Sequence, residues 1–114
     1  IMCVHIYGNP CDLDPIFHIA KENNLRVIED CAEALGSKYK NEHVGVNCDI
    51  ATLSFFGNKT ITTGEGGMVF SKNSDLVEKV AHLKNQSVSQ EIEYWHDLIG
   101  YNYRLTNIAS AIET

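Results

Sequence analysis

The chain of 114 residues has few basic residues and no long apolar run. Nine Lys and Arg stand against fifteen Asp and Glu, which gives a net charge of -6. No run is basic enough to follow a phosphate backbone. No apolar stretch reaches the roughly 20 residues that a membrane span requires, and no charged-then-apolar leader opens the chain. We therefore expect neither a nucleic acid nor a membrane as a partner.

Cysteine pairs at the spacing of a metal or redox site are also absent. The four cysteines lie at positions 3, 11, 31 and 48, at spacings of 8, 20 and 17 residues. These spacings match neither a CxxC pair nor a dense disulfide scaffold. We expect reduced thiols of a cytoplasmic protein, and no metal centre.

Internal repeats, low-complexity tracts and linkers are missing too. With 44% hydrophobic and 21% charged residues, the composition is that of a globular chain rather than a disordered one. The length fits one domain at most. Since the chain starts at Ile1 and not at a methionine, we expect it to be the middle part of a longer reading frame.

The first thirty residues predict a strand, a helix and a second strand. Residues 1–7 are rich in β-branched and aromatic side chains and stop at a Gly-Asn-Pro turn. Asp14 and Pro15 then supply an N-cap and a proline at the first helical position, N1, for a helix that reaches residues 23–24. Residues 26–30 read as the next strand, so the unit should be a right-handed parallel crossover. Asp30 falls at the carboxyl end of that strand, where such sheets bind ligands.

The rest of the chain continues the alternation of strands and helices. The predicted elements are a polar excursion at 38–46, strands at 50–56 and 67–71, a helix capped by Ser74 that ends near Asn85, an aperiodic stretch at 86–100 and a helix that starts near Thr106. The pattern predicts an α/β fold, a mostly parallel sheet with flanking helices.

The most informative stretch runs from Ser54 to Gly67 and places Lys59 among small and hydroxylic residues just after an apolar run. The nearest charges in sequence are Asp49 and Glu65. A lysine on a surface helix would sit among charges, so we expect this amine to point into a partly desolvated site and to act as a nucleophile. A Schiff-base lysine needs such a setting.

This stretch resembles the lysine segment of the DegT/DnrJ/EryC1/StrS family of pyridoxal-phosphate (PLP) sugar aminotransferases, particularly its perosamine-synthetase-type members. The resemblance runs along the whole chain. It implies that residues 1–114 are part of the large, PLP-binding domain of a fold-type-I transferase, with an N-terminal segment and a C-terminal small domain lying outside the sequence.

The resemblance also implies roles at the cofactor. Lys59 would bind PLP covalently and, once free, move a proton between the cofactor and the sugar. Asp30 would pair with the pyridine nitrogen, although alone it reads equally as a turn carboxylate or an N-cap. Glu33 would lie near the phenolic oxygen, protonated or bridged by water. Ser54 would contact the phosphate, although a small polar residue is also tolerated in a sheet.

The implied partner is a second copy of the protein. Asn102 would reach across a two-fold interface to the phosphate of the neighbouring subunit, unless its aromatic neighbours only anchor a loop. Arg104 would support the interface or an anionic ligand. Trp95 and His96 are candidates to line the sugar-nucleotide pocket, although a lone loop histidine is more often solvated. The glycines at 64, 66 and 67 fit no nucleotide-binding spacing and should permit tight turns beside the lysine.

The function implied is the amination of a nucleotide-linked keto-deoxy sugar with glutamate as donor, by a ping-pong reaction, for polysaccharide such as O-antigen. The resemblance favours a 4-keto, perosamine-type sugar. Two alternatives stay open: a non-catalytic truncated or interaction fragment, and a PLP-dependent sugar dehydratase of the same fold. Such dehydratases carry histidine in place of the lysine, so Lys59 favours the transaminase.

Overall fold

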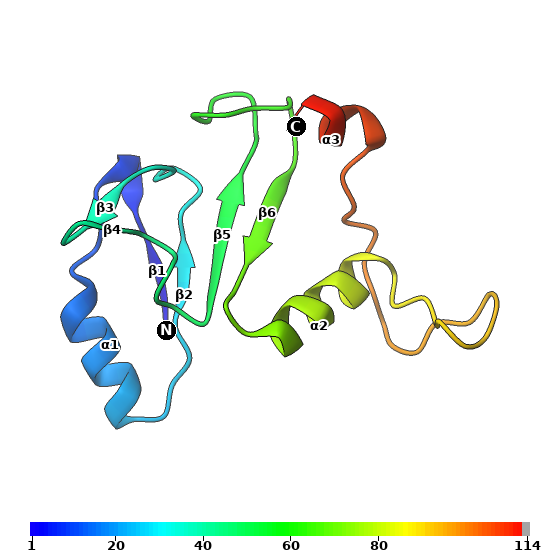
Figure 1. Ribbon diagram of the computed structural model, residues 1–114, viewed down its shortest axis with the longest axis horizontal. Helices are drawn as coiled ribbons and strands as arrows, with labels where there is room; N and C mark the ends of the chain where they lie inside the picture. The colour runs from blue at the N-terminus through cyan, green and yellow to red at the C-terminus, as the bar shows by residue number, and fades with distance from the viewer. Residues whose placement is uncertain (113–114) are drawn as a thin grey trace.

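The computed structural model describes residues 1–112, and its centre is a four-stranded sheet in the order β1-β2-β5-β6 (Figure 1). The strands are β1 (Met2–Val4), β2 (Ile28–Asp30), β5 (Ile50–Ser54) and β6 (Gly67–Phe70). The first three are parallel, whereas β6 runs antiparallel to β5. The predicted α/β fold with a mostly parallel sheet is confirmed.

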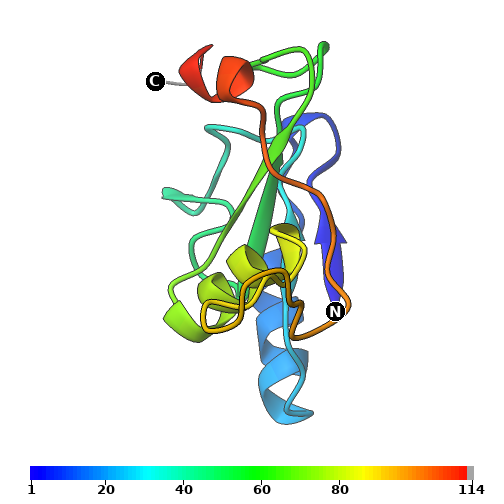
Figure 2. The same ribbon diagram turned by 90° about the vertical axis from the view of Figure 1, so that its right-hand side faces the viewer.

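Three α-helices and a small hairpin complete the fold. The helices are α1 (Leu13–Glu22), α2 (Ser74–Lys84) and α3 (Asn107–Ile112). The polar excursion forms the hairpin of β3 (Lys38–Tyr39) and β4 (Glu42–His43). Seen from the side, α3 lies at the same end of the molecule as the loop between β5 and β6 (Figure 2). No helix in the described part of the chain is long and apolar enough to cross a membrane.

The two longer helices lie on opposite faces of the sheet. Helix α1 packs its buried Leu13 and Ala20 with Cys3 of β1. Helix α2 lies against Val69 of β6. The register pairs Cys3 with Glu29, and Val69 with Thr52. These two pairs belong to adjacent rows of the sheet, so the side chains of Cys3 and Val69 point to opposite faces. The sheet is therefore covered on both faces, as parallel sheets usually are.

Helix α1 begins two residues before the predicted start. The helix starts at Leu13 with Asp12 at the N-cap position, so the prediction of Asp14 as N-cap was wrong. The earlier start is favoured because it buries the side chain of Leu13, which is only 4% exposed. Pro15 is the third helical residue and not the first as predicted, but it still lies in the first turn, where its missing N–H has no intrahelical partner to lose.

Helix α2 is capped by Asn73 and not by Ser74 as predicted. The Asn73 side chain accepts a hydrogen bond from the backbone N–H of Leu76 at 3.3 Å, the usual N-cap contact. The helix ends at Lys84, which confirms the predicted end near Asn85.

The first strand is shorter than the predicted span of residues 1–7. Val4 pairs with Asp30, the last residue of β2, so the ladder has no further partner. The chain then turns in the 3-10 element η1 (Ile6–Gly8), where Tyr7 adopts a φ of 51°. The backbone N–H of His5 still donates to the carbonyl of Asp30 at 3.1 Å. This corner brings the end of β1 next to the end of β2.

Candidate active site

The first part of the site is the Asp30 carboxylate at the carboxyl end of β2. Its Oδ1 accepts a hydrogen bond from the backbone N–H of Ala32 at 3.0 Å and one from Thr52 Oγ1 at 3.4 Å. The contact with Ala32 is that of a turn carboxylate, the plain alternative from the sequence. The contact with Thr52 adds a second point of attachment on the neighbouring strand. Asp30 is half-buried and held in one orientation.

Sequence reasoning missed Thr52, although the strand period could have found it. Thr52 precedes Ser54 by two residues in β5, so both side chains point to the face on which Asp30 lies. Ser54 Oγ accepts a hydrogen bond from the backbone N–H of Phe56 at 3.3 Å. The end of β5 thus carries two hydroxyls on the same side as the carboxylate.

Lys59 lies in a compact loop between β5 and β6. The Phe55 carbonyl accepts hydrogen bonds from the backbone N–H of Thr63 at 3.1 Å and from Thr62 Oγ1 at 2.9 Å, and the backbone N–H of Lys59 donates to the Phe56 carbonyl at 3.0 Å. The Lys59 side chain is only 16% exposed. The amine is therefore confined, as its sequence context predicts.

Glycines shape the return of this loop, as expected from the sequence. Gly64 and Gly66 have φ of +86° and +119°, which favour glycine. A Cβ on Gly66 would lie 2.4 Å from Leu105 Cδ2, and one on Gly67 would lie 2.7 Å from the Leu53 carbonyl oxygen. The close approach of β5 to β6 and of the loop to residue 105 requires glycine at these two positions.

Glu33 is the nearest charged partner of Lys59 that the structure shows. Lys59 Nζ lies 3.6 Å from Glu33 Oε1, and the backbone N–H of Tyr7 donates to Glu33 Oε2 at 2.8 Å. Both carboxylate oxygens face donors, so Glu33 is a counter-charge of Lys59 in this structure. Its expected place near the phenolic oxygen of the cofactor stays a prediction. The charges nearest in sequence, Asp49 and Glu65, are not the ones that pair with the amine in space.

The predicted residues of the second half of the chain lie on a separate segment. Asn102 pairs with Asn85 at the end of α2, and Arg104 donates to Asn85 Oδ1 at 2.9 Å. His96 Nδ1 lies 2.7 Å from the Gln86 carbonyl oxygen. All of them, with Trp95, are exposed. Within residues 1–112, no hydrogen bond or ion pair joins this segment to Asp30, Glu33, Ser54 or Lys59.

A wide groove on the described surface lies away from the lysine. A groove of about 650 Å³ runs between β6, α2 and the segment before α3, and most of its lining is apolar. Arg104 and Lys84 lie on its wall, whereas Lys59 and Asp30 do not. The groove is therefore a neighbour of the candidate active site and not part of it.

The arrangement combines an amine nucleophile, its counter-charge, a fixed carboxylate and two hydroxyls at the carboxyl ends of β2 and β5. Ligands bind at this end of parallel sheets. An amine so confined can add to a carbonyl carbon, and the fixed carboxylate can pair with a cationic ring nitrogen. The hydroxyls can donate to an anion.

Comparisons with known proteins agree with this chemistry. The GDP-perosamine synthase of Escherichia coli O157:H7 is 61% identical over 112 residues, which cover 98% of this chain and 31% of that protein. The GDP-perosamine synthase of Vibrio cholerae is 51% identical over 112 residues, 98% of this chain and 30% of that protein. The chain thus spans about a third of the length of these relatives.

Solved structures show the same fold. Helicobacter pylori PseC, an aminotransferase involved in the biosynthesis of pseudoaminic acid, superposes with a TM-score of 0.91 at 32% identity, over 98% of this chain and 31% of that one. The aminotransferase from Psychrobacter cryohalolentis superposes with a TM-score of 0.88 at 38% identity, over 98% of this chain and 31% of that one. The model of the DegT/DnrJ/EryC1/StrS aminotransferase family matches residues 1–114. The chain therefore belongs to the DegT/DnrJ/EryC1/StrS aminotransferase family.

Proposed function

We propose that the full-length protein is a PLP-dependent aminotransferase that transfers an amino group from glutamate to a nucleotide-linked keto sugar. Residues 1–114 then form part of its large, PLP-binding domain. The observation that carries the proposal is the confined Lys59 amine, which lies beside Glu33 in the loop after β5. Asp30 ends the neighbouring parallel strand β2 at the same edge of the sheet.

The described residues fit PLP in their chemistry. An aldehyde needs an amine, a pyridinium needs a carboxylate, and a phosphate needs neutral donors as well as charge. Lys59, Asp30 and Ser54 offer these groups from β2, β5 and the loop after β5. Relatives support the cofactor as well: EpsN of Bacillus subtilis, 38% identical over 112 residues, is named a candidate pyridoxal phosphate-dependent aminotransferase.

Each residue would act on a different part of the cofactor. PLP, when bound, supplies a ring that accepts the electron pair released at the carbon bearing the amino group. Lys59 Nζ would anchor the cofactor and, when free, carry a proton between the substrate carbon and the cofactor carbon. Asp30 would stabilise a positive charge on the ring nitrogen, and the hydrogen bonds from Ala32 and Thr52 to its Oδ1 hold the carboxylate in place for this role. Ser54 Oγ would donate to the phosphate.

The amino acceptor we propose is a nucleotide-linked 4-keto-6-deoxy sugar of the perosamine type, used for polysaccharide such as O-antigen. The names of the two perosamine synthases support this choice. Another relative, 40% identical over 114 residues, is a UDP-4-amino-4,6-dideoxy-N-acetyl-β-L-altrosamine transaminase of Campylobacter jejuni. The four free thiols fit a reducing compartment such as the cytoplasm.

We also propose that the enzyme is a homodimer with shared active sites. Asn102 is exposed and lies on a segment fixed along the end of α2, so it is available to a second subunit. In a two-fold dimer, it would donate to the cofactor phosphate of the partner. Arg104, Trp95 and His96 would line the sugar-nucleotide side of the same interface.

Borohydride trapping tests the lysine. Full-length protein incubated with PLP and reduced with borohydride should carry the pyridoxyl group on the peptide of Lys59. The Lys59→Ala variant should carry none, whereas Lys79→Ala, which removes an exposed lysine of α2, should label like the parent. A pyridoxyl group on a different lysine of the chain would overturn the assignment.

Subunit complementation tests the shared site. Lys59→Ala and Asn102→Ala should each be inactive as full-length proteins, and should regain part of the activity after co-expression. One of the two sites in the mixed dimer then combines an intact lysine with an intact asparagine. No recovery in a verified mixed dimer would place Asn102 outside the partner's site.

A further inference from the structure

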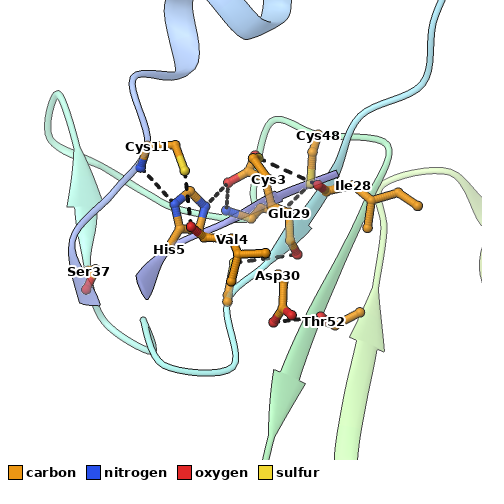
Figure 3. A network of polar contacts seen from close by, with 12 residues as sticks. Cys3, Val4, His5, Cys11, Ile28, Glu29, Asp30, Ser37, Cys48 and Thr52 are labelled. Atoms are coloured by element: carbon orange, nitrogen blue, oxygen red, sulfur yellow. Dashed lines mark hydrogen bonds and ion pairs between the residues drawn. The ribbon is translucent and has the colours of Figure 1, made fainter. Parts of the chain in front are cut away.

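A buried polar pair lies on the face of the sheet opposite to Asp30. Glu29 precedes Asp30 in β2, so the two side chains point to opposite faces. Glu29 and His5 are both 0% exposed. His5 Nε2 lies 3.0 Å from Glu29 Oε2 (Figure 3), and we call this pair the His5–Glu29 pin.

The hydrogen bonds around the pin set the orientation of its imidazole. The backbone N–H of Cys11 donates to His5 Nδ1 at 3.0 Å, so Nδ1 is an acceptor and the ring proton is on Nε2, facing Glu29. Glu29 Oε2 also accepts a hydrogen bond from the backbone N–H of Gly45 at 2.7 Å. The pin therefore ties together the end of β1, the centre of β2 and the loop before β5.

Stability alone does not account for the pin. Within the described residues, Glu29 Oε1 has no hydrogen-bond partner although it is buried. Taking a carboxylate out of water without a cation carries a desolvation penalty that a well-packed apolar side chain of similar volume would avoid. A buried polar group that costs stability is a candidate for a role in fixing one arrangement of the chain.

A metal ion is not the reason for the pin. His5, Glu29 and Cys31 offer ligand atoms that all lie within 4.8 Å of one another. Metal binding would need the Nε2 lone pair, which the tautomer set by Cys11 replaces with a proton. Burial, together with the nearby Glu29 charge, raises the pKa of Cys31 to about 12, so its thiol keeps its proton.

The pin connects to the candidate active site through the backbone. The N–H of His5 donates to the carbonyl of Asp30 at 3.1 Å, and the N–H of Cys31 donates to the carbonyl of Thr52 at 2.9 Å. The single peptide unit that follows Asp30 is thus held from both sides, by His5 after β1 and by Thr52 of β5. His5, whose side chain is fixed by Glu29, is the β1 partner in this arrangement.

A second connection runs through the corner after β1. Tyr7 follows His5 by two residues and adopts a φ of 51°, which points its N–H at Glu33 Oε2, 2.8 Å away. The other oxygen of Glu33 faces the Lys59 amine at 3.6 Å. The far side of the corner is held by Ser37 Oγ, which donates to the Gly8 carbonyl at 2.8 Å. The corner therefore places the counter-charge of the lysine.

We propose that His5 and Glu29 are positioning residues. From the face of the sheet opposite to Asp30, they fix the positions of Asp30 and Glu33 in the active site. Neither side chain touches the cofactor in this proposal. Its catalytic consequence rests on the proposed function, whereas its structural consequence does not.

Hydrogen exchange of the full-length protein without cofactor tests the structural part. Glu29→Leu and His5→Phe keep much of the volume but remove the pairing, and we expect the amides of Tyr7, Cys31 and Ala32 to exchange at least about tenfold faster. Glu29→Gln should exchange like the parent, because its amide oxygen still accepts from His5 and Gly45. Unchanged exchange in Glu29→Leu and His5→Phe would overturn the proposal.

Leu13→Ala is the matched control, because it removes an apolar side chain from the core beside Cys3 without touching the pin. It should speed exchange in α1 and leave the amides around Asp30 protected. Equal acceleration at those amides in Leu13→Ala would mean that the pin adds only general stability, and would overturn the proposal. If Glu29→Leu does not fold, the comparison of His5→Phe with Glu29→Gln tests the proposal by the same hydrogen-exchange measurement.

Steady-state kinetics test the catalytic part. We expect kcat to fall at least about tenfold in His5→Phe with KM for the sugar nucleotide within about threefold, and Glu29→Gln to keep most of kcat. Faster exchange with normal kcat would overturn the positioning role. A wild-type enzyme that aminates no sugar nucleotide would refute the proposed function, while the exchange data would still decide on the pin.

Discussion

Gly45→Ala is the substitution for which the structure gives the sharpest expectation. Gly45 is buried and has a φ of +84°. A Cβ there would lie 2.7 Å from Phe70 Cζ, 2.9 Å from Ala51 Cβ and 3.1 Å from Cys31 Sγ. These neighbours belong to the sheet and to the chain directly after it, so they have little room to move.

Three effects add to the loss of stability. The left-handed backbone disfavours alanine by about 1–2 kcal/mol. The overlap with packed side chains costs about 1–3 kcal/mol. Movement of the loop weakens the N–H donation to Glu29, and a buried donor left without its partner costs about 1–3 kcal/mol. We expect Gly45→Ala to lower the free energy of unfolding by roughly 3–8 kcal/mol.

Gly36→Ala is the control, because Gly36 has nearly the same φ of +86° but a Cβ on it would meet no atom within 4 Å. It should show the backbone effect alone, about 1–2 kcal/mol. Urea unfolding of the two full-length variants, side by side with the parent, measures the difference. Equal losses in both variants would refute the packing argument and would mean that the loop before β5 yields freely.

Three further predictions concern single side chains. After treatment with iodoacetamide at pH 8, peptide mapping should find Cys11 labelled and Cys31 protected until urea is added. Burial raises the pKa of Cys31 to about 12, so only about one Cys31 thiol in ten thousand is a thiolate at this pH. Labelling of Cys31 in the folded protein would contradict this. The hydrogen bond from the Val27 N–H lowers the pKa of Asp49 in the folded protein. The stability that the Asp49 carboxylate contributes is therefore present above about pH 4 and is lost as the pH falls through the pKa of the folded state. Asp49→Asn should therefore be less stable than the parent by about 1 kcal/mol at pH 6, with the gap closing toward pH 3; a gap independent of pH would be inconsistent with this account. Asp30→Asn should keep PLP bound but lose turnover by about 10²-fold or more, and near-normal turnover would remove Asp30 from the site.

Much of the fold was predictable because it depends on local patterns. The apolar runs ending at Asp30 and Ser54, and the helical spacing after Asn73, each reflect a single element with its own signal. The errors lie at the ends of elements. Asp12 and Asp14 are equally good caps by composition, and burial of Leu13 decides between them.

The site was predictable in its residues and not in its contacts. Lys59 was found from its unusual neighbours in sequence and its resemblance to the family segment. Its pairing with Glu33 joins residues 26 positions apart, and no local pattern encodes such a contact. Glu29 was hidden for a related reason: next to Asp30 it reads as one more charge at a strand end, and only the alternation of the pleat separates the buried carboxylate from the one at the site.

The neighbouring carboxylates of β2 make this strand intolerant of any change in length. Deletion of one residue before Glu29 would turn Asp30 toward His5 and leave the site without its carboxylate. Insertion of one residue would turn Glu29 to the face of the site and leave His5 without its partner. The composition and net charge would hardly change, yet the ring partner and the buried pair would be lost together. Sequence variation in this strand should therefore occur by substitution, while the surface loops on either side absorb the changes in length.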